Sequence, residues 1–128
     1  MNPFVLSVGQ CDFDHGNISR LLQREFGAKV ERAALADEAI AAAGRARYDL
    51  VLVNRILDSD GSTGLEVIRR LRESPATTDL PVMLVSNFAD AQEQAVALGA
   101  RPGFGKNGLE DGSTIARLRQ VLGRSEQP

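Results

Sequence analysis

Short apolar segments alternate with longer amphipathic ones along this chain. Three runs of about five residues are apolar at nearly every position, which is typical of strands buried on both faces of a parallel sheet. These runs are Phe4–Val8, Leu50–Val53 and Pro81–Val85. Two weaker segments give a fourth and a fifth expected strand. Apolar and polar residues alternate in Lys29–Ala33 as in an edge strand, and Gly103–Gly105 carries a faint strand signal.

Helical periodicity follows each of these strands. We expect Asp14 or Asn17 to cap the first helix and Gly27 to end it, Asp37 to begin the second and Asp90 to cap the fourth. The apolar positions that define the five helices lie in Ile18–Phe26, Ala39–Ala43, Leu65–Leu71, Ala91–Leu98 and Ile115–Leu122.

This order of elements predicts an α/β fold. Strands that alternate with helices indicate a parallel sheet with right-handed crossovers, and five such units fit the flavodoxin-like (βα)5 doubly wound sheet, order 2-1-3-4-5. We expect residues 1–123 to form this domain and residues 124–128 to form a tail. Ligands in this fold bind beyond the carboxyl ends of the strands, which here means Gly9–Asp14, Asn54–Gly64 and Ser86–Lys106.

Composition excludes several classes of function. The net charge is -2, from 15 basic and 17 acidic residues, so the chain offers no electrostatic footprint for nucleic acid or for an anionic membrane. No apolar run approaches the roughly 20 residues that span a bilayer. The single cysteine, Cys11, excludes an internal disulfide and fits a reducing, cytoplasmic compartment.

The three ligand-facing segments also carry a family resemblance. YDLVLVN at 48–54 with GLEVIRRLR at 64–72, and PVMLVSN at 81–87 with ALGARPGFGK at 97–106, resemble the response-regulator receiver domain of the CheY-like superfamily. The resemblance extends over roughly residues 4–122. It implies a phosphoacceptor Asp after the third strand, an acidic pair that helps to hold Mg²⁺, and a hydroxyl and a lysine that contact the phosphoryl group.

Carried over residue by residue, the resemblance is partial. The phosphoacceptor position falls on Asn54, and the acidic pair falls on Gly9 and Gln10. Ser86 matches the hydroxyl position and Lys106 matches the lysine. An amide is a poor nucleophile, and the neutral residues leave Mg²⁺ with little ligand charge. The resemblance therefore implies an atypical, degenerate member with no cofactor, no catalytic residue and no phosphorylation by the usual route.

Other departures point the same way. The position of the family's switch aromatic falls on Gly103, with Phe104 one place out of register, and Asn107 replaces the proline that often follows the lysine. The loop 58–62 is about two residues longer than the resemblance implies. Asn54 either satisfies the end of its strand by hydrogen bonding or permanently mimics one signalling state.

Four aspartates near the same edge leave alternatives open. Asp12 and Asp14 fit loop or helix-cap roles, and Asp58 or Asp60 could pair with Lys106. Together the four aspartates are weak candidates for a displaced Mg²⁺ or Ca²⁺ site.

Three functional hypotheses follow. The first is a phosphorylation-independent signalling module of two-component type, which binds a protein partner or a second copy through the fourth helix, fifth strand and fifth helix. The residues expected on that face are Arg101, Phe104, Arg117 and Arg119. The second is a phosphoacceptor that uses Asp58 or Asp60. The third is a small-molecule-binding flavodoxin-like module, although Gly9–Gly16 lacks the Ser/Thr-rich phosphate grip of flavodoxins.

Overall fold

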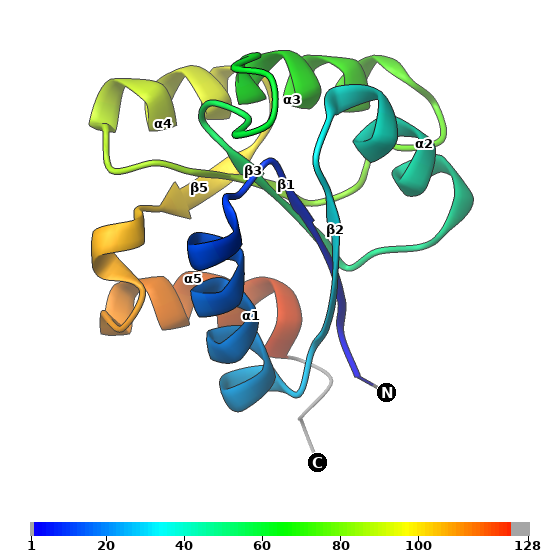
Figure 1. The fold of residues 1–128 in the computed structure, drawn as a ribbon. Coiled ribbons are helices and arrows are strands. Elements are labelled where there is room, and N and C mark those ends of the chain that lie inside the picture. The colour runs from blue at the N-terminus through cyan, green and yellow to red at the C-terminus, as the bar shows by residue number, and fades with distance from the viewer. Residues whose placement is uncertain (1, 124–128) are drawn as a thin grey trace.

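Five parallel strands lie between two layers of helices in the computed structural model of the chain, which describes residues 2–123 (Figure 1). The strands are β1 Phe4–Val8, β2 Lys29–Ala33, β3 Leu50–Asn54, β4 Val82–Val85 and β5 Arg101–Phe104. The helices are α1 Asp12–Phe26, α2 Ala36–Arg45, α3 Gly64–Glu73, α4 Ala89–Ala97 and α5 Gly112–Leu122, with a 3-10 turn at Lys106–Gly108. The sheet order β2-β1-β3-β4-β5 confirms the predicted fold class. The expected tail 124–128 lies outside the described residues.

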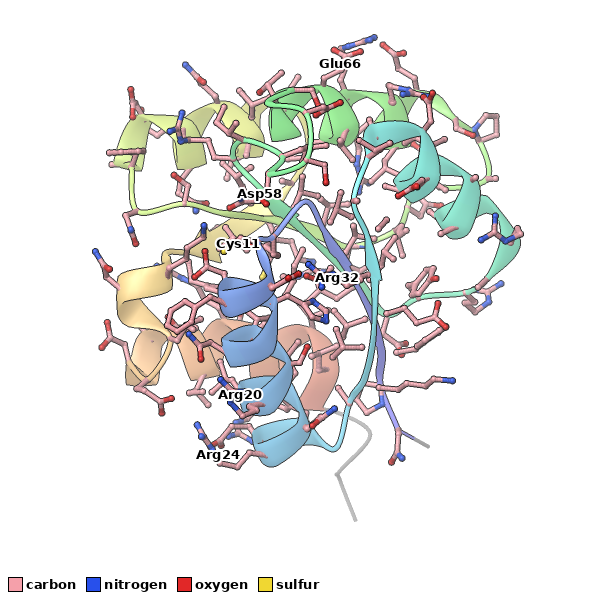
Figure 2. The ribbon with its side chains drawn as sticks, viewed as in Figure 1. Cys11, Arg20, Arg24, Arg32, Asp58 and Glu66 are labelled. Atoms are coloured by element: carbon pink, nitrogen blue, oxygen red, sulfur yellow. The ribbon has the colours of Figure 1, made fainter. Side chains whose placement is uncertain are left out.

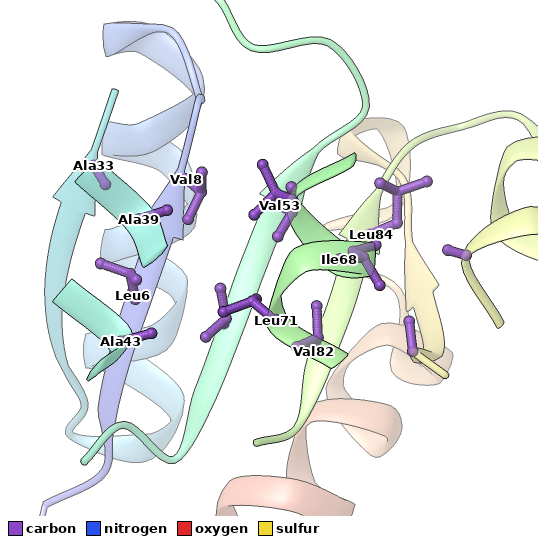
Figure 3. Packing of buried hydrophobic residues seen from close by; sticks show 14 of the residues in the cluster. Leu6, Val8, Ala33, Ala39, Ala43, Val53, Ile68, Leu71, Val82 and Leu84 are labelled. Atoms are coloured by element: carbon purple, nitrogen blue, oxygen red, sulfur yellow. The ribbon is translucent and has the colours of Figure 1, made fainter. Parts of the chain in front are cut away.

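Each face of the sheet carries its own hydrophobic core. On one face Leu6, Val8 and Val53 pack against α2, α3 and α4, including Ile68 and Leu71 (Figure 3). On the opposite face the alternate strand residues pack against α1 and α5. Strands β1, β3 and β4 are therefore buried on both sides, which explains why their sequences are apolar at successive positions.

Helix α1 begins earlier than the sequence predicted. Cys11 is its N-cap, and the Sγ atom accepts a hydrogen bond from the backbone N–H of Asp14 at 3.5 Å. The expected caps, Asp14 and Asn17, lie inside the helix, so that prediction was wrong. Cysteine is not a usual capping residue, but acidic side chains in the first turn suit the positive end of the helix dipole. Gly27 ends the helix as predicted, with φ +64°.

Two other helix starts differ by one or two residues. Helix α2 begins at Ala36, where the carboxylate of Glu38 accepts hydrogen bonds from the N–H groups of the two residues before the helix. Helix α4 begins at Ala89 after the N-cap Phe88, and the predicted cap Asp90 lies in its first turn. No helix in residues 2–123 has the length and apolar character needed to cross a membrane.

Candidate functional site

The carboxyl ends of β3, β4 and β5 surround a small cavity of about 220 Å³. Three of the residues singled out by sequence line it together: Asn54 at the end of β3, Ser86 after β4 and Lys106 after β5. The remaining two, Gly9 and Gln10, follow β1 on the other side of Asn54. At this edge of the sheet the cavity therefore lies on the side of β4, and the side of β1 lies outside it.

Asn54 holds the loops on both sides of it. Its Nδ2 atom donates a hydrogen bond to the carbonyl oxygen of Ile56 at 2.7 Å and a longer one to the carbonyl oxygen of Gly9 at 3.4 Å. The first bond fixes the exit from β3, and the second joins β3 to the turn after β1. These contacts need a donor, and an ionised carboxylate at this position has none to offer.

The β1 side of the edge is filled by Leu57. Gly9 has φ +74°, and a Cβ atom built on it would lie 2.3 Å from Cδ2 of Leu57. The backbone N–H of Asp58 donates to the carbonyl oxygen of Gly9 at 2.9 Å, which ties the β3–α3 loop to the end of β1. Leu57 is completely buried and belongs to the core under α2 and α3. The structure therefore leaves no room for a side chain at position 9.

The β3–α3 loop has its own internal structure. The N–H of Leu57 donates to the carbonyl oxygen of Ser62 at 2.8 Å, and Gly61, with φ +74°, closes the turn. Asp60 accepts hydrogen bonds from the hydroxyl of Ser62 at 2.7 Å and from its N–H at 2.9 Å, which lowers the pKa of the Asp60 carboxyl. Asp58 is exposed, at the start of the loop after β3 (Figure 2). Asp60 thus stabilises its own turn.

Lys106 pairs with Asp14 and not with the aspartates of that loop. Its Nζ atom lies 2.7 Å from Oδ2 of Asp14, which also accepts a hydrogen bond from Sγ of Cys11 at 3.3 Å. Burial raises the pKa of Asp14, but the hydrogen bonds from Lys106 and Cys11 outweigh burial and bring that pKa below its usual value. The predicted partners Asp58 and Asp60 were wrong because α1 begins at Asp12, which brings its first turn beside Lys106.

The four aspartates do not gather into one site. Asp12 makes an ion pair with Arg32 at 2.9 Å on the surface, while Asp14 makes its ion pair with Lys106. Within the described part of the chain, no group of three or more His, Cys, Asp or Glu residues is arranged to hold a metal ion. Gln10 is buried, with only a long 3.5 Å hydrogen bond from Nε2 to the carbonyl oxygen of Val8.

Three side chains at the mouth of the cavity were missed by sequence reasoning. The guanidinium of Arg55 lies over the ring of Phe88, 4.8 Å from its centroid. Phe88 is 55% exposed and Ile56, beside it, is 38% exposed. The available signal was that an apolar residue follows within three positions of the ends of β3 and β4, where polar turn residues are expected.

The face formed by α4, β5 and α5 has a shallow, mainly apolar groove of about 470 Å³. Its lining includes Val96, which is 43% exposed, together with Pro102 and Arg117. Arg117 donates to the carbonyl oxygen of Gly103 at 2.7 Å, and Arg101 is exposed at the start of β5. Of the predicted face residues, Arg117 therefore lines this groove, whereas Arg101 is exposed on β5 and is not among the residues that line it.

The other two predicted face residues lie elsewhere. Phe104 is 3% exposed in the core between the sheet and helices α1 and α5, so its expected surface role was wrong. Arg119 lies over the ring of Phe26, 5.5 Å from its centroid, and so faces α1. Gly103 cannot be replaced by an aromatic residue without rearrangement, since its Cβ would lie 2.1 Å from the carbonyl oxygen of Leu84.

Comparison with known proteins decides the family. The model of the response regulator receiver domain matches residues 14–107 of this chain. The chain belongs to that family. No curated protein sequence matches it. Receiver domains are signalling modules that interact with proteins such as kinases and effectors, and this receiver domain has the fold of that family.

Solved receiver domains share the fold at low sequence identity. The chain is similar to CheY4 of Vibrio cholerae, with 23% identity, a TM-score of 0.74, and coverage of 95% of this chain and 100% of that one. The receiver domain of a DNA-binding response regulator from Colwellia psychrerythraea is 22% identical, with a TM-score of 0.79 and coverage of 96% and 100%. That of a sensor histidine kinase from Pseudomonas aeruginosa, which holds magnesium in its active site cleft, is 21% identical, with a TM-score of 0.72 and coverage of 97% of both chains.

Proposed function

We propose that this receiver domain signals without phosphorylation, as a protein–protein interaction module of a two-component-type pathway in the cytoplasm. The observation that carries the proposal is the burial of Leu57 against Gly9, at the position where the family resemblance implies a metal-binding carboxylate. A buried leucine in van der Waals contact with the backbone leaves neither the space nor the oxygen ligands that Mg²⁺ requires.

The position of Asn54 supports the proposal. Its amide donates to two carbonyl oxygens, so the residue serves the loops and offers no negatively charged nucleophile. Without a carboxylate nucleophile and a cation to neutralise developing charge, phosphoryl transfer lacks both of its main requirements. We therefore assign Asn54 to the phosphoacceptor-equivalent position in a structural role, and we propose that the Mg²⁺ site is lost.

Lys106 and Ser86 retain their places but have other partners. The ion pair with Asp14 neutralises the ammonium group of Lys106, and Ser86 accepts the N–H of Phe88 at 3.1 Å. The pair of Lys106 with Asp14 joins the loop after β5 to α1, and the side-chain oxygen of Asn87 accepts the N–H of Asn107 at 3.2 Å, which joins the loops after β4 and β5. Fixed loops suit a domain that presents a constant surface to a partner.

The proposed interaction surface is the groove between α4, β5 and α5. Val96 and Pro102 give it an apolar centre, and Arg117 and Glu93 give it charges of both signs at the rim. This combination is typical of protein interfaces, which enrich arginine around an apolar core. A second copy of the chain or a different protein would bind here.

The alternative of a relocated phosphoacceptor is tested together with the proposal. The purified domain is incubated with acetyl phosphate and Mg²⁺, and its intact mass is measured beside that of an ordinary receiver domain that has the aspartate. We expect no phosphoryl adduct on this chain. An adduct that disappears in Asp58→Asn or Asp60→Asn would establish the relocated acceptor and overturn the proposal. The flavodoxin-like alternative predicts a coloured protein or a melting temperature that rises with added nucleotide, and we expect neither.

A further inference from the structure

A groove runs across the mouth of the cavity between the β3–α3 and β4–α4 loops. The 220 Å³ cavity beside Asn54 and Lys106 adjoins a second cavity of about 350 Å³ that reaches Gln94 on α4. Arg55, Ile56 and Phe88 line both cavities, so the two form one continuous depression.

Apolar surface is concentrated along this groove. Among the large apolar side chains exposed in the described part of the chain, Ile56 and Phe88 both face it. Both belong to loops whose other exposed residues are mainly polar. Exposed apolar side chains that adjoin each other in a depression with a polar rim mark a surface that another molecule covers.

Positive charge at the groove is available only on Arg55. Its guanidinium stacks on Phe88 and, within residues 2–123, forms no ion pair with a carboxylate closer than 4 Å. Lys106 lies at the inner end but is neutralised by Asp14, and Asp90 lies at the outer end near Gln94. A guanidinium that lies over an aromatic ring can still direct N–H donors to a carboxylate.

We propose that this groove binds an extended segment of the partner protein in which an acidic side chain is flanked by aliphatic ones. The carboxylate would contact Arg55, and the aliphatic side chains would cover Ile56 and Phe88. The inference deepens the proposed function, on which it rests, because it names the chemistry of a partner. Arginine and aromatic residues at the centre of a desolvated patch are the residue types that carry most binding energy in protein interfaces.

The probe is the capped peptide acetyl-Leu-Glu-Leu-amide, added at millimolar concentration to the full chain without Mg²⁺ and followed by amide NMR shifts. We expect saturable shifts at Asn54–Ile56 and Ser86–Phe88. Acetyl-Leu-Gln-Leu-amide, which has the same shape without the charge, should bind about tenfold more weakly, since a hydrogen bond to a charged group contributes more than a neutral one. Acetyl-Gly-Glu-Gly-amide tests the aliphatic contribution and should also bind more weakly.

Variants distinguish binding in the groove from a general effect of the net charge of the protein. Arg55→Gln should weaken binding of the Glu peptide about tenfold while leaving the Gln peptide unchanged. Arg47→Gln is the matched control, because Arg47 is exposed at the opposite edge of the sheet and its loss changes the net charge equally. Phe88→Leu keeps the apolar contact but removes the ring under Arg55, and should give a smaller loss than Arg55→Gln.

The proposal is overturned if no residue of the groove shifts, if the Glu and Gln peptides bind equally, or if Arg55→Gln and Arg47→Gln behave alike. Each of these results leaves the phosphorylation-independent function intact when acetyl phosphate still gives no adduct. An adduct from acetyl phosphate overturns that function whatever the peptides do. The two failures are therefore distinguishable.

Discussion

The two sides of the carboxyl edge of this sheet have opposite structures. On the β1 side, Leu57 packs against Gly9 and the space belongs to the hydrophobic core. On the β4 side, Ser86 and Lys106 border a cavity that stays open. The difference shows that neighbouring strand ends in one sheet can be packed independently, one filled by a core side chain and the other left open.

The physical reason lies in the β3–α3 loop. A loop with a left-handed Gly61 can turn back on itself and place one apolar side chain inward. Burying a leucine side chain stabilises the fold by about 1.5–3 kcal/mol, which favours a loop conformation that places Leu57 in this space. The β4–α4 turn has no such inward residue, since Phe88 points to solvent.

Removal of Leu57 should give the largest effect on the closed side. We expect Leu57→Ala to lower the free energy of unfolding by about 3–4 kcal/mol, because it removes a fully buried side chain and leaves a cavity. Urea denaturation measures the change. The neighbouring Ile56→Ala is the control and should cost about 1 kcal/mol or less, as Ile56 is partly exposed. Equal losses in the two variants would mean that Leu57 is not a core residue.

Gly9→Asp tests directly whether a carboxylate fits beside Leu57. We expect a loss of about 2–3 kcal/mol, from backbone strain at φ +74° and from the clash with Cδ2 of Leu57. In the double variant Gly9→Asp with Leu57→Ala, the clash with Cδ2 is absent. The loss of stability in the double variant should therefore be smaller than the sum of the losses in the two single variants. Strict additivity would show that the leucine does not obstruct position 9.

Asn54→Asp sharpens the comparison at the boundary between the two sides. We expect a loss of about 1–2 kcal/mol at pH 7, because an ionised carboxylate would face the carbonyl oxygens of Gly9 and Ile56 without a proton to donate. This arrangement raises the pKa of the introduced carboxyl, so the lost stability should return as pH falls through that pKa. Denaturation at pH 7 and pH 4 checks the sign, and a variant that is most stable at pH 7 would contradict it.

The smallest effect concerns the ion pair on the open side. Asp14→Asn should cost about 1 kcal/mol or less at neutral pH, since the pair is partly exposed. The folded-state pKa of Asp14 is lowered, so its contribution is present above the unfolded pKa of about 3.9 and is lost as pH falls through the folded value. Wild type and variant should therefore converge in acid. Asp12→Asn, which removes a more exposed pair with Arg32, is the matched control and should cost less stability at neutral pH.

The sequence predicted the sheet well because three of its strands are buried on both faces. It also placed Asn54, Ser86 and Lys106 at one edge, since strand ends in a parallel sheet meet there. It missed the partner of Lys106, because a cysteine N-cap hid the true start of α1. It misplaced Phe104, as periodicity in a four-residue strand is too short to show which face a side chain takes. It passed over Leu57, whose burial depends on contacts with a glycine distant in sequence.

The central claim is that Leu57 leaves no room for a metal ion at the carboxyl end of β1. Its most direct test is an amide NMR titration of the wild-type domain with Mg²⁺, followed by beryllofluoride as a mimic of the phosphoryl group. The signals to follow are those of Gly9–Asp14, Asn54–Asp60, Ser86 and Lys106. We expect no saturable shift in these segments at millimolar Mg²⁺, with or without beryllofluoride. Shifts that appear together in the Gly9–Asp14 and Asn54–Asp60 segments and saturate would show that a metal enters beside Leu57, and would contradict the account.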